Sequence, residues 1–403
     1  MSYPGTLPAD STPPAVEEVH LGSGTGGVLL ALLAPCGRAL RAVGHAVSSG
    51  FEFLVGLAAL VLGLAILATI PVFQFVSLGY LLESSRRVAH SGRWREGLMG
   101  VRLAARIGTA ALVTLLAIIP LRVLFDLRQS AELLGNREAA RGFSIAATLL
   151  MVGMVVHVSW GIARGSRLRH FLWPAPIRFC KSVASGAFAT GLLGQLSTWW
   201  RSLPLGPLFG VGLRGFLIGL AWLGPPVSLV AISTQLPEGP AFLTAAVGIL
   251  WLAAIQLVLP FLQLNAVAAQ SLREGFAIRR VRRQFGRAPV AFFVAVLATL
   301  SLALPLYALK AELIPREAAW LPCVVFVLSI WPARLLVGWA VHRAERRDQP
   351  RHFLFRWSSR LALLPVAILY ALIVYLTQFI SWYGVWSLYE QHAYLLPVPF
   401  VGF

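Results

Sequence analysis

The sequence contains little charge for its length. Only 12% of its 403 residues are charged, against about 25% in a soluble domain, while 58% are hydrophobic and the mean hydropathy is +0.75. This deficit excludes a soluble enzyme, a disordered tail and a nucleic-acid-binding domain, despite a formal net charge of +18. Several uncharged windows of about 20 residues can each cross the roughly 30 Å core of a bilayer as a helix. The sequence therefore predicts an all-α, polytopic helical membrane protein.

Residue patterns that carry chemistry are scarce as well. Cys36, Cys180 and Cys323 lie far apart without a Cys-x-x-Cys spacing, which excludes a disulfide framework and a thiolate metal site. The sequence has no H-E-x-x-H, G-x-S-x-G or P-loop motif, and no acidic residue lies in the middle of an apolar window. We therefore expect no enzymatic activity, no cofactor and no carboxylate relay for protons.

Apolar windows predict about eight transmembrane helices, near residues 51–82, 103–124, 143–163, 215–236, 241–270, 288–309, 319–341 and 361–382. Arginine is concentrated in the connections after the first, third, fifth and seventh windows and is sparse in the others. The positive-inside rule places those four connections in the cytoplasm, next to anionic lipids, and predicts that both termini are non-cytoplasmic.

The windows recur in order along the chain. Residues 52–75 match residues 241–264 without a gap, and the polar words REAA (137–140, 316–319) and RHFL (169–172, 351–354) each occur twice. We interpret this pattern as two parallel four-helix repeats, 51–236 and 241–382. A polar N-terminal tail with a short apolar stretch, 1–50, precedes them, and an aromatic C-terminal tail, 383–403, follows.

Only the first repeat carries an extra segment, an amphipathic cytoplasmic insertion at about 173–212. Within it, residues 183–200 combine basic ends, paired tryptophans and small residues. They form either a helix that lies in the membrane interface or a short re-entrant hairpin.

A repeated Pro-x-x-Gln pattern is the best candidate site. Pro71 and Pro260 each interrupt a long apolar window, and Gln74 and Gln263 follow one turn later, joined by Asn265 in the second repeat. Paired across the repeats, these amides predict a polar site on a solute path. The alternative is structural, since each amide can satisfy carbonyls that a proline kink frees and so hold the repeats together.

Two ionisable side chains, His157 and Arg334, lie well inside predicted spans, where such a group is a functional hypothesis by default. We place both in the same inter-repeat site. A neutral histidine bonded to a carbonyl, or an arginine reaching the nearby basic loop, would need no function. Further helix breaks are predicted at Pro120, Pro305, Pro225 and Pro226.

Residues 78–97 (LGYLLESSRRVAHSGRWREG) and 273–289 (REGFAIRRVRRQFGRAP) resemble a known family. It comprises uncharacterised bacterial multi-pass membrane proteins and is defined as a domain of unknown function. In that family a Gly-Tyr pair and a run of arginines follow the first span and lead into an amphipathic inner segment. The resemblance implies a bacterial cytoplasmic membrane location and supplies no activity.

Together these features predict a permease-like or solute-path bundle without a catalytic site. Its inter-repeat interface would be lined by Gln74, Gln263, Asn265, His157 and Arg334. The alternative hypothesis is a membrane scaffold or assembly factor that recruits a membrane or soluble protein partner through its basic cytoplasmic loops and the 173–212 insertion. An intramembrane enzyme acting on lipid is disfavoured, because no nucleophile can be paired with a base.

Overall fold

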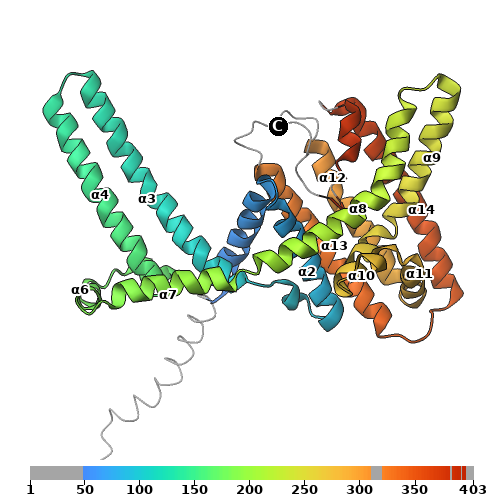
Figure 1. Cartoon of the computed structure of the whole chain (residues 1–403), viewed down its shortest axis with the longest axis horizontal. Coiled ribbons are helices and arrows are strands. Elements are labelled where there is room, and N and C mark those ends of the chain that lie inside the picture. Colours follow the sequence, from blue (N-terminus) through green and yellow to red (C-terminus); the bar gives the residue numbers. More distant parts are fainter. Residues whose placement is uncertain (1–48, 310–319, 382–383, 392, 396–403) are drawn as a thin grey trace, which may run out of the picture. The chain divides into compact units, whose positions relative to one another are not determined.

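The computed structural model describes residues 49–309, 320–381, 384–391 and 393–395, so most of the predicted tails 1–50 and 383–403 and the second REAA word lie outside the described residues. Every regular element among the described residues is helical (Figure 1). Eight helical runs are long and apolar enough to cross a membrane, which confirms the predicted fold class. These runs are Ser49–Thr69, α3 (Val101–Leu133), α4 (Arg137–Ala163), α7 with α8 (Ala187–Ser202 and Leu205–Ser233), α9 (Glu238–Gln256), α12 (Pro289–Ala308), α13 (Trp320–Glu345) and α14 (Phe353–Ile380).

Shorter helical elements connect the long ones. They are α2 (Gln74–Ser91), η1 (Trp94–Gly97), α5 (Leu168–Leu172), α6 (Pro176–Ala184), α10 (Leu259–Ala268), η2 (Leu272–Phe276), α11 (Ile278–Arg287) and η5 (Gly384–Tyr389). Within the predicted insertion, α6 and α7 are joined at Gly186, whose φ of 70° is readily adopted by glycine, and neither helix has a buried residue. Helix α7 packs against α4.

The predicted first span, 51–82, is wrong as a single helix. The helix Ser49–Thr69 ends at a tight bend that contains Pro71 and Val72, and Val72 has a φ of 73°, which is strained for a β-branched residue. Beyond the bend α2 folds back along the first helix, and the hydroxyl of Ser77 donates to the carbonyl of Leu64 at 2.7 Å. Proline therefore marks a reversal of the chain here, where the sequence predicts a kink.

Because of this reversal, α3 runs in the same direction as the helix Ser49–Thr69. Gly56 lies against Val101 and Ala105, and Gly108 lies against Ala59, so the contacts advance in the same direction along both helices. The helix Ser49–Thr69 and α3 are therefore parallel and begin at the same end of the bundle. Helix α2, which lies between these two helices in the sequence, returns the chain to that end.

Helix α2 is enclosed by protein. It packs between α8 and α13, and its polar residues Ser77, Glu83, Ser84 and Ser85 are buried. At the crossing with α8, a Cβ on Gly79 would collide with the carbonyl of Leu208, and one on Gly212 would collide with the carbonyl of Phe75. Only glycine lets the two backbones approach this closely. The polar content of α2 is tolerated because neighbouring helices, and not lipid, surround it.

The structure corrects most of the predicted helix breaks. Pro120, Pro305, Pro225 and Pro226 all lie inside continuous helices. A proline removes one backbone hydrogen bond, whereas a full break inside a bilayer would expose several unpaired backbone groups, each costing several kcal/mol in hydrocarbon. Pro260 is the second residue of α10, just after a turn at Leu257 and Val258 that separates α9 from α10.

The glycine crossing gives a testable expectation. We expect Gly79→Ala to destabilise the protein by about 1–3 kcal/mol, because the methyl group forces α2 and α8 apart. In the matched control Gly63→Ala, where nothing lies within 4 Å of the new Cβ, helix propensity predicts a gain of about 0.5–1 kcal/mol. Thermal melting of the detergent-solubilised variants measures both, and equal melting temperatures would contradict the close crossing.

Candidate functional site

Two predicted site residues, Gln263 and Arg334, meet at one short segment near the C-terminus. Gln263 on α10 is fully buried, and its Nε2 donates to the carbonyl of Tyr394 at 3.1 Å and to that of Gly215 at 2.8 Å. Arg334 on α13 is 1% exposed, and its Nη2 donates to the carbonyl of Ala393 at 3.2 Å. An amide and a guanidinium on different helices thus bind adjacent peptide units.

Residues 393–395, which we call the C-terminal plug, lie inside the helix bundle. Ala393, Tyr394 and Leu395 are all buried, and the hydroxyl of Tyr394 donates to the carbonyl of Gln256 at the end of α9 at 2.9 Å. The backbone N–H groups of Tyr394 and Leu395 both donate to the carbonyl of Gln391. Sequence reasoning missed this insertion, because a tail of aromatic residues is equally typical of a membrane interface.

Several buried polar atoms around the plug have no hydrogen-bond partner among the described residues. They are Nε and Nη1 of Arg334, both amide atoms of Gln256, and Oε1 of Gln263 and of Gln391. No carboxylate among the described residues forms an ion pair with Arg334. A buried cation and unpaired amides cost several kcal/mol unless something binds them. The arrangement suits a small anion or polar solute, or ordered water.

Asn265 forms a separate pair. Its amide exchanges two hydrogen bonds with the amide of Gln284, at 3.1 and 3.2 Å, and both side chains are buried. This pair fixes the basic helix α11 to α10. Both the nitrogen and the oxygen of the Asn265 amide are hydrogen-bonded. The oxygen of the Gln263 amide, in contrast, has no partner among the described residues.

The other two predicted residues lie elsewhere. Gln74 is buried at the start of α2, and the recorded hydrogen bonds of Gln263 go to backbone carbonyls and not to Gln74. His157 is half-buried on α4, where its ring lies 6.4 Å from that of Phe171 on α5. The principal neighbours of α4 are α3, α5 and α7, so the structure separates His157 from Arg334.

Within the described parts of the chain, no three His, Cys, Asp or Glu side chains gather in a way that could hold a metal ion. Comparison of the chain with protein-family models, with curated proteins and with solved structures finds no match. The resemblance to the bacterial domain of unknown function therefore stays a prediction.

Melting temperatures of variants can show whether Arg334 and Gln263 form a binding site or only stabilise the fold. We expect Arg334→Met to leave the melting temperature nearly unchanged, because the removal of an uncompensated buried charge offsets the loss of the hydrogen bond to the carbonyl of Ala393. Gln263→Leu should instead cost about 1–3 kcal/mol, since it leaves two buried carbonyls without their donor. A lower melting temperature for Arg334→Met than for Gln263→Leu would show that Arg334 is mainly structural.

Proposed function

We propose that this membrane protein is a permease-like bundle whose solute site is centred on Arg334 and Gln263. One observation carries the proposal: among the described residues, a fully buried guanidinium keeps two donors without partners, beside glutamine atoms that also lack partners there. Residues that serve packing alone are normally satisfied when buried. A site that binds and releases a solute needs such atoms, and its cost in stability is typical of functional positions.

The chemistry of the cluster favours an anionic solute. Among the described residues Arg334 leaves Nε and Nη1 without partners, and these two donors lie on different edges of the planar guanidinium. Its buried positive charge and two separate N–H donors favour an anion over a neutral solute. The C-terminal plug occupies the neighbouring space and holds the remaining donors through the carbonyls of Ala393 and Tyr394. In this proposal the plug seals the path and moves when the solute passes.

The proposed orientation differs from the predicted one at the N-terminus. Because Ser49–Thr69 and α3 begin at the same end of the bundle, the start of the first helix and the arginine-rich connection before α3 share one side of the membrane. The positive-inside rule makes that side the cytoplasm.

A tandem duplication remains part of the proposal. Each Pro-x-x-Gln segment leads through a short, largely buried helix into a 3₁₀ turn with the sequence Arg-Glu-Gly, in η1 and in η2. Both glycines are buried, Gly97 against Leu335 of α13 and Gly275 against Ile218 of α8. The repeats differ at the bend, since α2 folds back along its preceding helix whereas α10 packs mainly on α8.

A scaffold is the second candidate, and a different observation favours it. In the most apolar windows of α3 and α4 only 11% and 17% of residues are buried, against 61% in α13. Helices α6 and α7 add further exposed surface with no buried residue. Such surfaces are covered by lipid or by a partner in the membrane.

Anion flux tests the first candidate directly. We expect proteoliposomes loaded with potassium chloride, and given a potassium ionophore, to release chloride faster than empty liposomes. Arg334→Gln should slow release about tenfold or more, because it removes a charged donor from the path. Arg282→Gln, at an exposed position on α11, is the matched control and should behave as the unmodified protein.

Chloride is the probe because it is small and membrane-impermeant, and the same vesicles can be loaded with radiolabelled phosphate. Folded protein that releases neither anion above the background of empty liposomes would rule out the anion path and leave the scaffold as the proposed function.

The native Cys36 tests the proposed orientation. In a Cys180→Ser, Cys323→Ser chain it is the remaining thiol, and we expect a membrane-impermeant maleimide to label it only after the cells are permeabilised. Labelling of Cys36 in intact cells would place the N-terminal tail outside and restore the orientation predicted from the sequence.

A further inference from the structure

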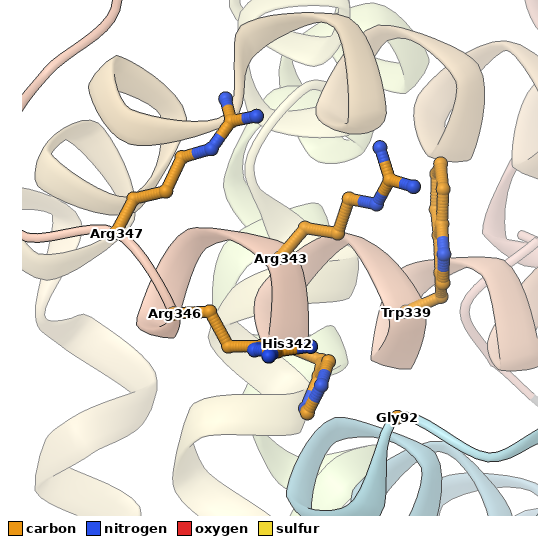
Figure 2. Close-up of a pocket in the computed structure, with 6 residues that line it drawn as sticks. All are labelled: Gly92, Trp339, His342, Arg343, Arg346 and Arg347. Atoms are coloured by element: carbon orange, nitrogen blue, oxygen red, sulfur yellow. The ribbon is translucent and has the colours of Figure 1, made fainter.

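The end of α13 forms a pocket that is separate from the polar cluster around Arg334. Its volume is about 560 Å³, and its lining is strongly basic (Figure 2). The lining residues are Gly92, Trp339, His342, Arg343, Arg346 and Arg347. The guanidinium of Arg343 lies over the ring of Trp339, 4.7 Å from its centroid, so one wall is an ordered cation–aromatic pair.

Backbone contacts hold this lining in position. Nδ1 of His342 bonds to the carbonyl of Ala89 at 2.9 Å, and Gly92, at a φ of 72°, leaves the space that the imidazole ring occupies. Nη1 of Arg347 donates to the carbonyl of Arg287 at 3.3 Å. Arg343 and Arg346 remain exposed. The pocket is thus fixed on α2, α11 and α13, and two of its arginines are free to meet a ligand.

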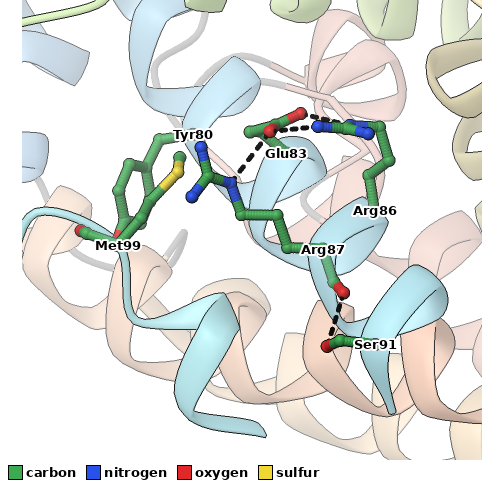
Figure 3. A network of polar contacts seen from close by, with 6 residues as sticks. All are labelled: Tyr80, Glu83, Arg86, Arg87, Ser91 and Met99. Atoms are coloured by element: carbon green, nitrogen blue, oxygen red, sulfur yellow. Dashed lines mark hydrogen bonds and ion pairs between the residues drawn. The ribbon is translucent and has the colours of Figure 1, made fainter. Parts of the chain in front are cut away.

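The arginines on α2, unlike those that line the pocket, are paired with a carboxylate. On α2, Glu83 accepts hydrogen bonds from Arg86 at 2.6 and 2.7 Å and from Arg87 at 3.0 Å, so both guanidinium groups are paired with a carboxylate of the chain, which offsets one of their two positive charges (Figure 3). Among the described residues no carboxylate forms an ion pair with Arg343, Arg346 or Arg347. These three arginines are therefore not paired with a carboxylate of the described chain, in contrast to Arg86 and Arg87.

We propose that this pocket binds a phosphate group, supplied by the headgroup of an anionic phospholipid. Helix α13 is long and apolar enough to cross the membrane, and His342 and Arg343 lie in its last turn, at the level where headgroup phosphates lie. Planar guanidinium groups match phosphate oxygens in pairs, and Trp339 is typical of this depth. The proposal does not depend on transport, because the pocket and the Arg334 cluster share no residue.

Arginines at the end of α13 can also be explained without a bound ligand. The helix dipole favours cations there, and basic residues are retained in cytoplasmic loops by topology alone. A general surface attraction would be spread over all exposed arginines, whereas a built pocket concentrates binding on its own lining. The test must therefore compare arginines inside and outside the pocket at equal change in charge.

The experiment titrates short-chain phosphatidylglycerol into the full-length protein in neutral detergent and follows the melting temperature, which rises with occupancy of a site on the folded state. We expect Arg343→Gln/Arg346→Gln to weaken binding about 30-fold, or about fivefold per arginine. The control Arg282→Gln/Arg283→Gln removes the same charge from exposed positions on α11 and should change binding less than threefold. Arg343→Lys/Arg346→Lys keeps the charge but loses the paired donors, and it should fall between the two.

A parallel arm uses sodium phosphate, with sodium chloride at equal ionic strength as its reference. Stabilisation by phosphate that is lost in Arg343→Gln/Arg346→Gln and retained in the α11 control supports the phosphate site and identifies a soluble phosphate as a second source. Equal losses in the two double variants, or no stabilisation by either ligand, would overturn the proposal and reduce the pocket to ordinary surface charge.

Discussion

The close crossing of α2 and α8 at Gly79 and Gly212 is the constraint on which the rest of the bundle depends. It lets a helix rich in buried polar residues lie inside a membrane protein without meeting lipid. Helix α13 packs on the other side of α2, where Gly338 lies against the backbone of α2. Helix α10 packs against α8. A polar central helix, and not the eight apolar spans alone, therefore organises the fold.

Enclosing α2 also explains where charge is found. Glu83 is the acid that pairs with both arginines of α2, so this helix offsets part of its own positive charge. Arg334 has only the carbonyl of Ala393 as a partner among the described residues, and the arginines at the end of α13 have no carboxylate there. Basic groups among the described residues thus occur in three settings: paired with a carboxylate of the chain, buried with donors that have no described partner, and exposed in a pocket. The two proposed binding sites lie in the last two settings.

Much of the architecture could be predicted from the sequence, because crossing a bilayer imposes length and hydropathy on each helix separately. The windows around 143–163 and 288–309, for example, correspond closely to α4 and α12. The reversal at Pro71 could not be predicted, since a proline in an apolar run indicates a kink or a turn equally well, and the choice depends on packing with α8 and α13. The same holds for Pro225 and Pro226, where packing keeps α8 continuous.

The candidate site was predictable only in part. Buried amides and an intramembrane arginine are rare enough for composition to single out Gln263 and Arg334. Their common partner could not be found in this way, because the plug lies 131 residues after Gln263 and carries no pattern of its own. Gln256 could not be singled out either, because its sequence context is that of any glutamine near a helix end. The prediction that His157 lies near Arg334 was wrong because spacing along a span does not determine which helices pack together.

The reversal of the chain between the first helix and α2 is the central claim, and one cross-link tests it most directly. In a chain whose native cysteines are serine, Leu64→Cys and Ser77→Cys should form an intramolecular disulfide, because the hydrogen bond between these residues brings their backbones close together. A continuous helix would hold the two positions about 20 Å apart, since each residue adds about 1.5 Å. A linked peptide pair in the mass spectrum after mild oxidation is the result we expect. Two separate, unlinked peptides from fully folded protein would contradict the account.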